Sequence, residues 1–274
     1  MAAENLKNPY KPIKAEITAI TEDAPDIKTF SLQLDAPIEF ATGQFIQLTV
    51  PGIGEAPFTP SSKPGRGKNI EVTIMKVGTA TGVLHKMKAG DMAAVRGPYG
   101  NGFPLEDIRD RELIIVAGGV GLAPLRTLIY EIMENKERYP RSLLLYGCKT
   151  PDGILYKESF SDWEKDFEIH RTVDNPDGQW EECTGVVTTL FDKIEVDTGE
   201  AAAVIVGPPI MMKFAALELE KMGISPERII VSMEKNMTCG FGKCRHCLLG
   251  DYYVCKDGPV FTYAQIKDIE GAWD

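Results

Sequence analysis

The amino-acid sequence predicts a β-barrel or small sandwich, then a doubly wound α/β domain with a parallel sheet, and finally a cysteine-bearing C-terminal segment. Apolar and polar residues alternate through the N-terminal part, which is the two-residue period of half-buried strands. Apolar strands then alternate with helical stretches, and four of the six cysteines crowd between Cys239 and Cys255. The 274 residues also exceed what one hydrophobic core usually organises.

The β-rich domain is expected over residues 1–108. Strand patterns occur in IKAEITAITED, IKTFSLQL, QFIQLTV and NIEVTIMKV, and glycine or proline stands at the joins. Short strands at this spacing are typical of a small barrel. One inserted helix is expected from Gly82 to Lys88.

The α/β domain is expected over residues 109–233. Its strand candidates are ELIIVAGG, RSLLLYGC, FEIHRTV, AAAVIVG and RIIVSM. Helical periods fall at 123–138, 155–166, 186–194 and 209–222. Because strand and helix alternate, the strands should run parallel, with helices on both faces.

The C-terminal segment, residues 234–274, lacks a long periodic element. We expect it to take its order from whatever the cysteines bind, with a short hairpin near YYVC and PVFTY.

Four, two and seven residues separate the crowded cysteines, which are Cys239, Cys244, Cys247 and Cys255. Four-then-two is the spacing of plant-type [2Fe–2S] ferredoxins, in which four thiolates hold two irons. Gly240 and Gly242 would permit the crowded loop backbone. A structural zinc site is the alternative, although zinc usually takes two separated short-spaced pairs. His246 could replace one ligand, but a solvent-facing position is the simpler interpretation.

A second motif, LIIVAGGVGLAPLRTLI, combines an apolar strand, a glycine-rich turn and the start of a helix. Such a turn lets a phosphate approach the helix N-terminus. The spacing is not G-x-G-x-x-G, so glycine needed for packing alone remains an alternative. Residues expected to bind here are Gly118, Gly119, Gly121, Ala123 and Pro124.

Two further turns, YGCKTPDGILY and VGPPIMMK, follow predicted strands. Ligands of open α/β sheets bind at the carboxyl ends of the strands, so these turns should line one crevice with the glycine-rich turn. The expected wall of the crevice consists of Gly147, Tyr156, Gly207, Pro209 and Met211.

The formal charge of −10 and the pI near 5.0 argue against nucleic-acid or anionic-membrane binding. The polar, proline-bearing beginning of the chain does not have the pattern of a signal peptide. The longest apolar run, residues 113–125, is too short and too glycine-rich for a membrane span. We therefore expect a cytoplasmic protein.

The order of APFTPSS, RGPYG, AGGVGLAP, YGCKTPD, VGPPIMM and the cysteine cluster resembles the ferredoxin-NADP reductase superfamily along nearly the whole chain. Within it, GPYGNGFP and CKDGPVFTY are similar to the gamma subunit of soluble nickel-iron hydrogenases and sulfhydrogenases. One of the subunits of anaerobic sulfite reductase and the electron-transfer subunit of dihydroorotate dehydrogenase are also similar.

The resemblance implies an FAD between the two domains. Phe58, Thr59 and Ser62 match the aromatic and hydroxyl positions that lie against the flavin ring. Ala56 stands where the family often has an arginine, which would leave the pyrophosphate to backbone N–H groups. Those groups belong to Thr81, Gly82 and Val83.

The resemblance also implies an activity. NAD(P)H would deliver a hydride to FAD, and single electrons would pass through the [2Fe–2S] cluster to or from a large catalytic or iron-sulfur subunit of an anaerobic oxidoreductase. No side chain is expected to act as a catalytic acid, base or nucleophile. Whether NADH or NADPH is preferred stays open, with Lys149 a candidate contact for a 2′-phosphate. The alternatives are a dihydroorotate dehydrogenase electron-transfer subunit and a zinc-stabilised nucleotide sensor.

Overall fold

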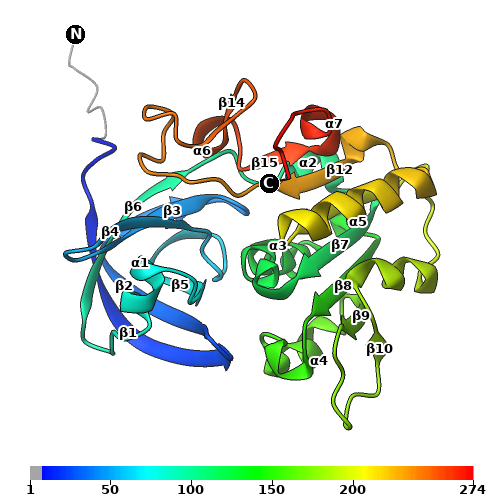
Figure 1. The fold of residues 1–274 in the computed structure, drawn as a ribbon, viewed down its shortest axis with the longest axis horizontal. Helices are drawn as coiled ribbons and strands as arrows, with labels where there is room; N and C mark the ends of the chain where they lie inside the picture. The colour runs from blue at the N-terminus through cyan, green and yellow to red at the C-terminus, as the bar shows by residue number, and fades with distance from the viewer. Residues whose placement is uncertain (1–7, 274) are drawn as a thin grey trace.

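The computed structural model describes residues 8–273 and contains two large sheets, one in each expected domain (Figure 1). The barrel-like sheet lies beside the α/β sheet, and the C-terminal segment runs across the top of both in this view. The combination of a β-barrel-like domain, a parallel α/β domain and a cysteine-bearing tail confirms the predicted fold class.

The N-terminal sheet is antiparallel throughout, in the order β4-β3-β6-β1-β2-β5. Its strands are β1 (Ile13–Ala24), β2 (Ile27–Phe40), β3 (Phe45–Val50), β4 (Gly54–Phe58), β5 (Gly65–Met75) and β6 (Met92–Tyr99). Alternate residues of these strands point inward, so that Ile17, Phe30, Leu32, Ile46 and Val72 share one buried core.

The helix of this domain, α1 (Thr79–Leu84), begins three residues before the expected position. The hydroxyl of Thr81 accepts hydrogen bonds from the N–H groups of Val77 and Gly78, at 2.9 Å each. This local bonding fixes the start of the helix at a place that hydrophobic periodicity does not mark.

The second sheet has the order β10-β9-β8-β7-β11-β12-β15. Its parallel strands are β7 (Glu112–Gly118), β8 (Arg141–Cys148), β9 (Glu168–Val173), β10 (Cys183–Thr184), β11 (Ala202–Val206) and β12 (Ile229–Ser232). Strands β8 and β9 lie on one side of β7, and β11 and β12 lie on the other. The chain order therefore reverses between β7 and β11, where doubly wound folds bind their ligands.

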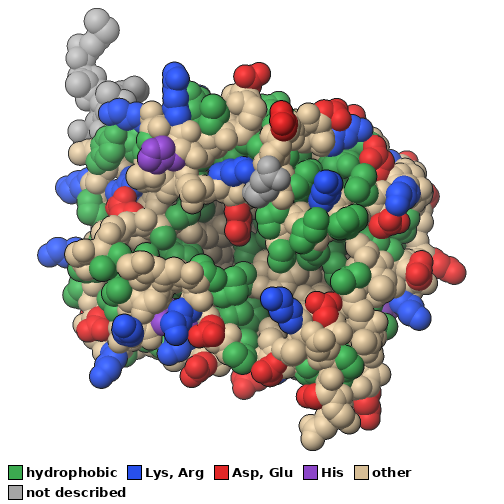
Figure 2. Space-filling model, viewed as in Figure 1, with side chains coloured by type: hydrophobic (Ala, Val, Ile, Leu, Met, Phe, Trp, Pro, Cys, Tyr) green, Lys and Arg blue, Asp and Glu red, His purple; other side chains and the backbone are tan. Residues whose placement is uncertain are grey.

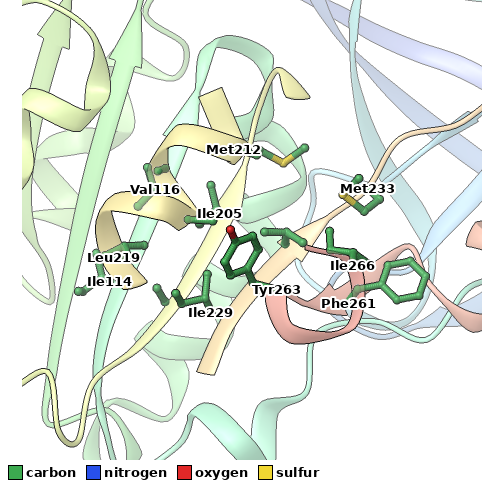
Figure 3. Packing of buried hydrophobic residues seen from close by; sticks show 14 of the residues in the cluster. Ile114, Val116, Ile205, Met212, Leu219, Ile229, Met233, Phe261, Tyr263 and Ile266 are labelled. Carbon is green, nitrogen blue, oxygen red and sulfur yellow. The ribbon is translucent and has the colours of Figure 1, made fainter. Parts of the chain in front are cut away.

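Helices cover both faces of this sheet. On one face, α5 (Pro209–Met222) packs Met212 and Leu219 onto the central strands (Figure 3). On the other face lie α3 (Leu122–Glu134) and the one-turn α4 (Phe160–Trp163). The short α2 (Leu105–Ile108) precedes β7. The helices expected at 123–138 and 209–222 are thus present as α3 and α5.

Two expected helices take a different form. At 155–166, Tyr156 has a left-handed backbone (φ +53°), so only a 3₁₀ turn at Lys157–Ser159 and α4 follow it. At 186–194 the chain forms a 3₁₀ helix, Val187–Lys193. The β-branched residues at its start and a bond from the Thr189 hydroxyl to the Val186 carbonyl (2.8 Å) work against an α-helix there.

A short hairpin forms near YYVC, as expected, but PVFTY is not part of it. Strand β14 (Tyr252–Tyr253) pairs instead with β13 (Leu248–Leu249) across a tight turn at Gly250, which has φ +54°. After α6 (Val254–Asp257), β15 (Val260–Thr262) adds antiparallel to the free edge of β12, and α7 (Tyr263–Ile266) follows. An unpaired sheet edge is a ready partner for a strand, and this pairing is not visible in local sequence.

Residues 8–273 contain no helix with the length and hydropathy that crossing a bilayer requires.

Candidate functional site

The turns after β7 and β11 meet at the carboxyl edge of the α/β sheet, where the chain order reverses. They approach so closely that a Cβ on Gly121 would lie 2.4 Å from the carbonyl oxygen of Val206. A Cβ on Gly207 would lie 3.1 Å from the Cα of Gly118. Glycine is therefore required here for packing, in addition to any role in binding.

Gly119 differs from its neighbours in this turn. Its φ is +52°, and a Cβ added to it would meet no atom within 4 Å. The backbone of the turn therefore borders open space on this side, which leaves room for a ligand to approach. Because α3 starts just after this turn, its first-turn N–H groups lie next to the same space.

Some of the remaining residues expected near this edge lie at the turns after β7 and β11, and others lie elsewhere. Ala123 and Pro124 lie in the first turn of α3, and Pro209 begins α5. Met211 covers Gly118, since a Cβ on that glycine would lie 2.3 Å from the Met211 sulfur. The turns after β7 and β11 thus come together as expected at a topological switch point.

Gly147 and Tyr156 have other surroundings. A Cβ on Gly147 would lie 2.9 Å from the Cβ of Val187, so this glycine packs against the 3₁₀ helix. Tyr156 is buried; its hydroxyl lies 2.6 Å from the Thr73 hydroxyl, and its ring lies 4.4 Å from the Arg126 guanidinium carbon. Tyr156 therefore joins the α/β domain to the barrel instead of standing free at the crevice.

This contact is part of a buried polar network at the domain joint. On β5, the Thr73 hydroxyl also bonds the hydroxyls of Thr29 (2.6 Å) and Ser61 (2.9 Å). Arg126 of α3 donates to the carboxylate of Glu71 at 2.9 Å. The joint fixes the barrel and the α/β domain at one relative position, which a cofactor lying between them requires. Figure 2 shows a hollow between the two domains, bordered by hydrophobic side chains.

The flavin segment expected from the resemblance follows β4. Phe58 ends this strand half-buried against the barrel core, and Thr59 is also half-buried. Ser62 accepts a hydrogen bond from the Glu71 N–H at 3.0 Å. Ala56 sits in the same strand, opposite Leu48, so no charge replaces the arginine of the family pattern. The half-buried aromatic face and hydroxyl are of the kind that can hold a flavin ring.

The pyrophosphate-binding segment expected around α1 is only partly open. The Thr81 side chain is buried and is used to fix the start of the helix. A Cβ on Gly82 would meet no atom within 4 Å, and Val83 is half-buried against the barrel core. The backbone at Gly82 is thus accessible to a ligand.

The four crowded cysteines lie in one loop system, with Cys239, Cys247 and Cys255 buried and Cys244 half-buried. The Cys244 thiol is among the groups near Cys239, and the Cys247 thiol is among those near Cys255. Backbone N–H groups also point at sulfur, from Gly242 to Cys255 (3.0 Å) and from Lys243 to Cys239 (3.3 Å). Such donors stabilise negative charge on the sulfur atoms.

The surrounding protein shifts the pKa values of Cys239 and Cys255 in opposite directions. Burial alone would raise the pKa of Cys239, but hydrogen bonds from the N–H groups of Phe241, Cys244 and Lys243 lower that pKa to about 6. Burial and the neighbouring Cys247 raise the pKa of Cys255. Gly240 and Gly242 have φ of +89° and +80°, and a Cβ on Gly240 would lie 2.9 Å from the Tyr99 ring. The loop therefore needs glycine at both positions.

Four cysteines in one loop system, with N–H groups directed at two of the sulfurs, fit a two-iron cluster, in which each iron takes two of the four thiolates. Among residues 8–273, no three His, Cys, Asp or Glu side chains converge on a single ion, and a two-iron cluster does not require them to. His246 is exposed, and its Nδ1 lies 2.8 Å from the Thr238 hydroxyl.

Glu234 was not among the expected site residues. It follows β12 in a span that crosses to the barrel, where the Gln47 side-chain amide donates to the Met237 carbonyl at 2.9 Å. The span borders a groove of about 620 Å³ that includes Glu55, Ala56 and Pro57 of β4. The Glu234 side chain reaches solvent, yet the surrounding protein raises the pKa of its carboxyl by desolvation. The sequence feature that could have identified Glu234 is its position directly after the apolar strand RIIVSM, because ligands of such sheets bind at the carboxyl ends of strands.

Comparisons with known proteins agree with this arrangement. Residues 14–103 match the oxidoreductase FAD-binding domain, and residues 115–216 match the oxidoreductase NAD-binding domain. Residues 234–267 match the iron-sulfur cluster binding domain of dihydroorotate dehydrogenase B. The cofactors are therefore FAD, a nicotinamide nucleotide and an iron-sulfur cluster, in the order that the sequence predicted.

Relatives match along nearly the full length. The chain is 39% identical to the sulfhydrogenase 2 gamma subunit of Pyrococcus furiosus, covering 93% of this chain and 96% of that protein. It is 34% identical to a probable dihydroorotate dehydrogenase B (NAD⁺) electron transfer subunit of Pyrococcus abyssi, covering 91% and 89%. A solved NADH-dependent reduced ferredoxin-NADP oxidoreductase superposes with a TM-score of 0.73 at 26% identity, covering 93% and 89%. The chain therefore belongs to the ferredoxin-NADP reductase superfamily and, within it, to the family of flavin- and iron-sulfur-binding electron-transfer subunits that contains the first two relatives.

Proposed function

We propose that this chain carries electrons between a nicotinamide nucleotide and a nickel-iron hydrogenase or sulfhydrogenase type of catalytic subunit, in the cytoplasm of an anaerobic organism. The observation that carries the proposal is the position of the cysteine loop. It is bonded to the barrel at Met237 and Cys239, while its half-buried Cys244 and exposed Lys243 and Arg245 face outward. A cluster held there would stand between the flavin domain and the surface.

The division of labour follows from the chemistry of the groups. When bound, FAD accepts an electron pair as a hydride, and a [2Fe–2S] cluster takes electrons one at a time. The residues of this chain bind and orient: the turns after β7 and β11 would hold the nucleotide, Phe58 and Thr59 the flavin ring, and the four cysteines the irons. A hydride carries two electrons and one proton, so one proton per hydride must leave the site.

The sulfhydrogenase assignment rests on the 39% identity to the sulfhydrogenase 2 gamma subunit of Pyrococcus furiosus, compared with 36% to a probable dihydroorotate dehydrogenase electron transfer subunit of Pyrococcus horikoshii. The second gamma subunit of Pyrococcus furiosus is 35% identical. The difference in sequence identity between the two kinds of subunit is small, so the identity of the partner subunit distinguishes them. The crowded cysteines suit a reducing compartment, which supports a cytoplasmic location.

Anaerobic co-purification from the native host tests the partner. A tagged chain is expected to bring down a large subunit containing nickel and iron. Recovery of a dihydroorotate-oxidising, flavin-containing subunit would instead select the alternative.

A dye assay tests the order of the carriers. NADH or NADPH should reduce a viologen or ferricyanide through this chain. The Cys244→Ser variant should lose transfer to the partner subunit to a greater extent than it loses dye reduction, because small dyes can accept electrons before the cluster. Equal loss of both activities would contradict the proposed order.

A further inference from the structure

Arg96 of β6 is a buried cation that connects the barrel to the cysteine loop. Its side chain is 4% exposed, and its Nε and Nη2 donate to the two carboxylate oxygens of Glu55 at 2.8 and 2.5 Å. Its Nη1 donates to the carbonyl oxygen of Cys239 at 3.2 Å, and also to the Tyr99 hydroxyl (2.7 Å) and the Pro9 carbonyl (2.9 Å). One guanidinium thus bonds a second barrel strand and a cluster-ligand residue together.

A second contact holds the next residue of the same loop. The Tyr99 ring, three residues along β6, lies where a Cβ on Gly240 would be 2.9 Å away. The Tyr99 hydroxyl is itself bonded to Arg96 and donates to the Pro9 carbonyl at 2.7 Å. Arg96 and Tyr99 of the barrel therefore contact the consecutive residues Cys239 and Gly240.

Holding the cysteine loop against the barrel does not by itself require a charged residue at position 96. Burying the Arg96 guanidinium removes a charge from water, whereas Glu55 keeps 27% of its side chain exposed, and well-packed neutral residues often stabilise a fold as well or better. The nitrogen that reaches the Cys239 carbonyl is not one of those bonded to Glu55. The Arg96 guanidinium is therefore in direct contact with the cysteine loop, and the Glu55 carboxylate lies on the other side of the guanidinium.

A charge in this position affects an iron-sulfur cluster in a definite direction. Reduction adds one negative charge, which a nearby cation stabilises and a nearby anion destabilises. Hydrogen bonds and charges around the ligands are the means by which a protein sets a cluster's potential.

We propose that Arg96 is a positioning residue for the cysteine loop and that the Arg96–Glu55 pair sets the reduction potential of the cluster. The guanidinium raises the potential and the carboxylate lowers it. This inference rests on the proposed function only in requiring a [2Fe–2S] cluster at the four cysteines.

The test is an anaerobic potentiometric titration of the holoprotein, followed by electron paramagnetic resonance, with iron content measured for each variant. Arg96→Gln should shift the cluster midpoint to more negative potential. Glu55→Gln should shift it to more positive potential, because the cation is left uncompensated. The double variant should lie between the two, and Arg96→Lys, which keeps the charge, should stay nearest to the wild type while losing some iron.

A purely structural role predicts something else, namely iron loss in both single variants with midpoints that move together or not at all. That result would overturn the inference, as would an Arg96→Lys shift as large as that of Arg96→Gln. Arg109 and Glu131, 2.6 Å apart and partly buried on the α2 and α3 side of the fold, form the matched control. Arg109→Gln and Glu131→Gln should leave the midpoint unchanged. If the wild type shows no reducible cluster, the proposed function fails, and with it the premise of this test.

Discussion

Gly119 and Gly121 are two residues apart in one turn but are needed for different reasons. Gly121→Ala would force a Cβ to within 2.4 Å of the Val206 carbonyl oxygen, so the turns after β7 and β11 would have to separate. The Cβ of Gly119→Ala would meet no atom within 4 Å. Its cost is the strain of placing alanine in the left-handed backbone conformation, about 1–2 kcal/mol. Its methyl group would enter the space assigned to the nucleotide.

We therefore expect Gly121→Ala to lower the free energy of unfolding more than Gly119→Ala does. Gly119→Ala should weaken NAD(P)H binding while the fold persists. Urea unfolding and nucleotide titration of both variants check this contrast. If Gly119→Ala bound nucleotide like the wild type, the open space beside it would not be the nucleotide site.

The thiols of Cys239 and Cys255 should differ in their response to pH. Because N–H donors lower the pKa of Cys239 to about 6, this thiol should be largely ionised at pH 7 once iron is removed. The raised pKa of Cys255 keeps that thiol protonated in the same conditions. Alkylation of iron-free protein by iodoacetamide, read by peptide mass spectrometry from pH 5 to 9, should modify Cys239 before Cys255. Modification of Cys255 before Cys239 would contradict the hydrogen bonding described for the loop.

At the scale of elements, β7, β8 and β11 and the helices α3 and α5 follow from hydrophobic period, because each buries a regular apolar face. Glycine turns likewise marked the carboxyl edge where the site lies. Local sequence could not show that Tyr156 turns toward the barrel, since this depends on Thr73, which is 83 residues away. The pairing of β15 with β12 depends in the same way on a distant free edge.

Tyr156→Phe tests the domain joint. Removing the hydroxyl deletes the 2.6 Å bond to Thr73, at a cost of about 1 kcal/mol in the free energy of unfolding. Because the joint holds the two walls of the flavin site, FAD should also dissociate faster. Chemical denaturation and flavin release report the two effects. Tyr130→Phe is the control, because this tyrosine faces the same Arg126 but its hydroxyl makes none of the joint's hydrogen bonds. Equal effects in both variants would argue against the joint.

The span from β12 to the barrel carries a pH prediction. Desolvation raises the pKa of Glu234 in the folded protein above its value of 4.5, so its contribution to stability is greatest below pH 4.5 and is lost as pH rises through the folded pKa. Glu234→Gln should therefore raise the melting temperature at pH 8, and the gain should shrink toward pH 4.5. A melting-temperature gain that is the same at both pH values would show that Glu234 is not desolvated.

For the whole molecule, the order of barrel, α/β domain and cysteine segment was predictable because each part has its own period or motif. The way the parts lock together was not. Arg96 lies in the RGPYG segment, and only the folded chain brings it to Cys239, 143 residues away. The C-terminal segment also supplies β15 to the α/β sheet, so cluster binding and nucleotide binding share one structural unit.

The central claim is that one chain joins a nicotinamide site, a flavin and a two-iron cluster into a single electron path. The most direct measurement is anaerobic addition of NADH or NADPH to the purified complex, with absorption and electron paramagnetic resonance recorded together. The account predicts bleaching of the flavin band and the appearance of a reduced [2Fe–2S] signal. Flavin bleaching with no cluster signal, or a colourless protein containing zinc, would contradict it.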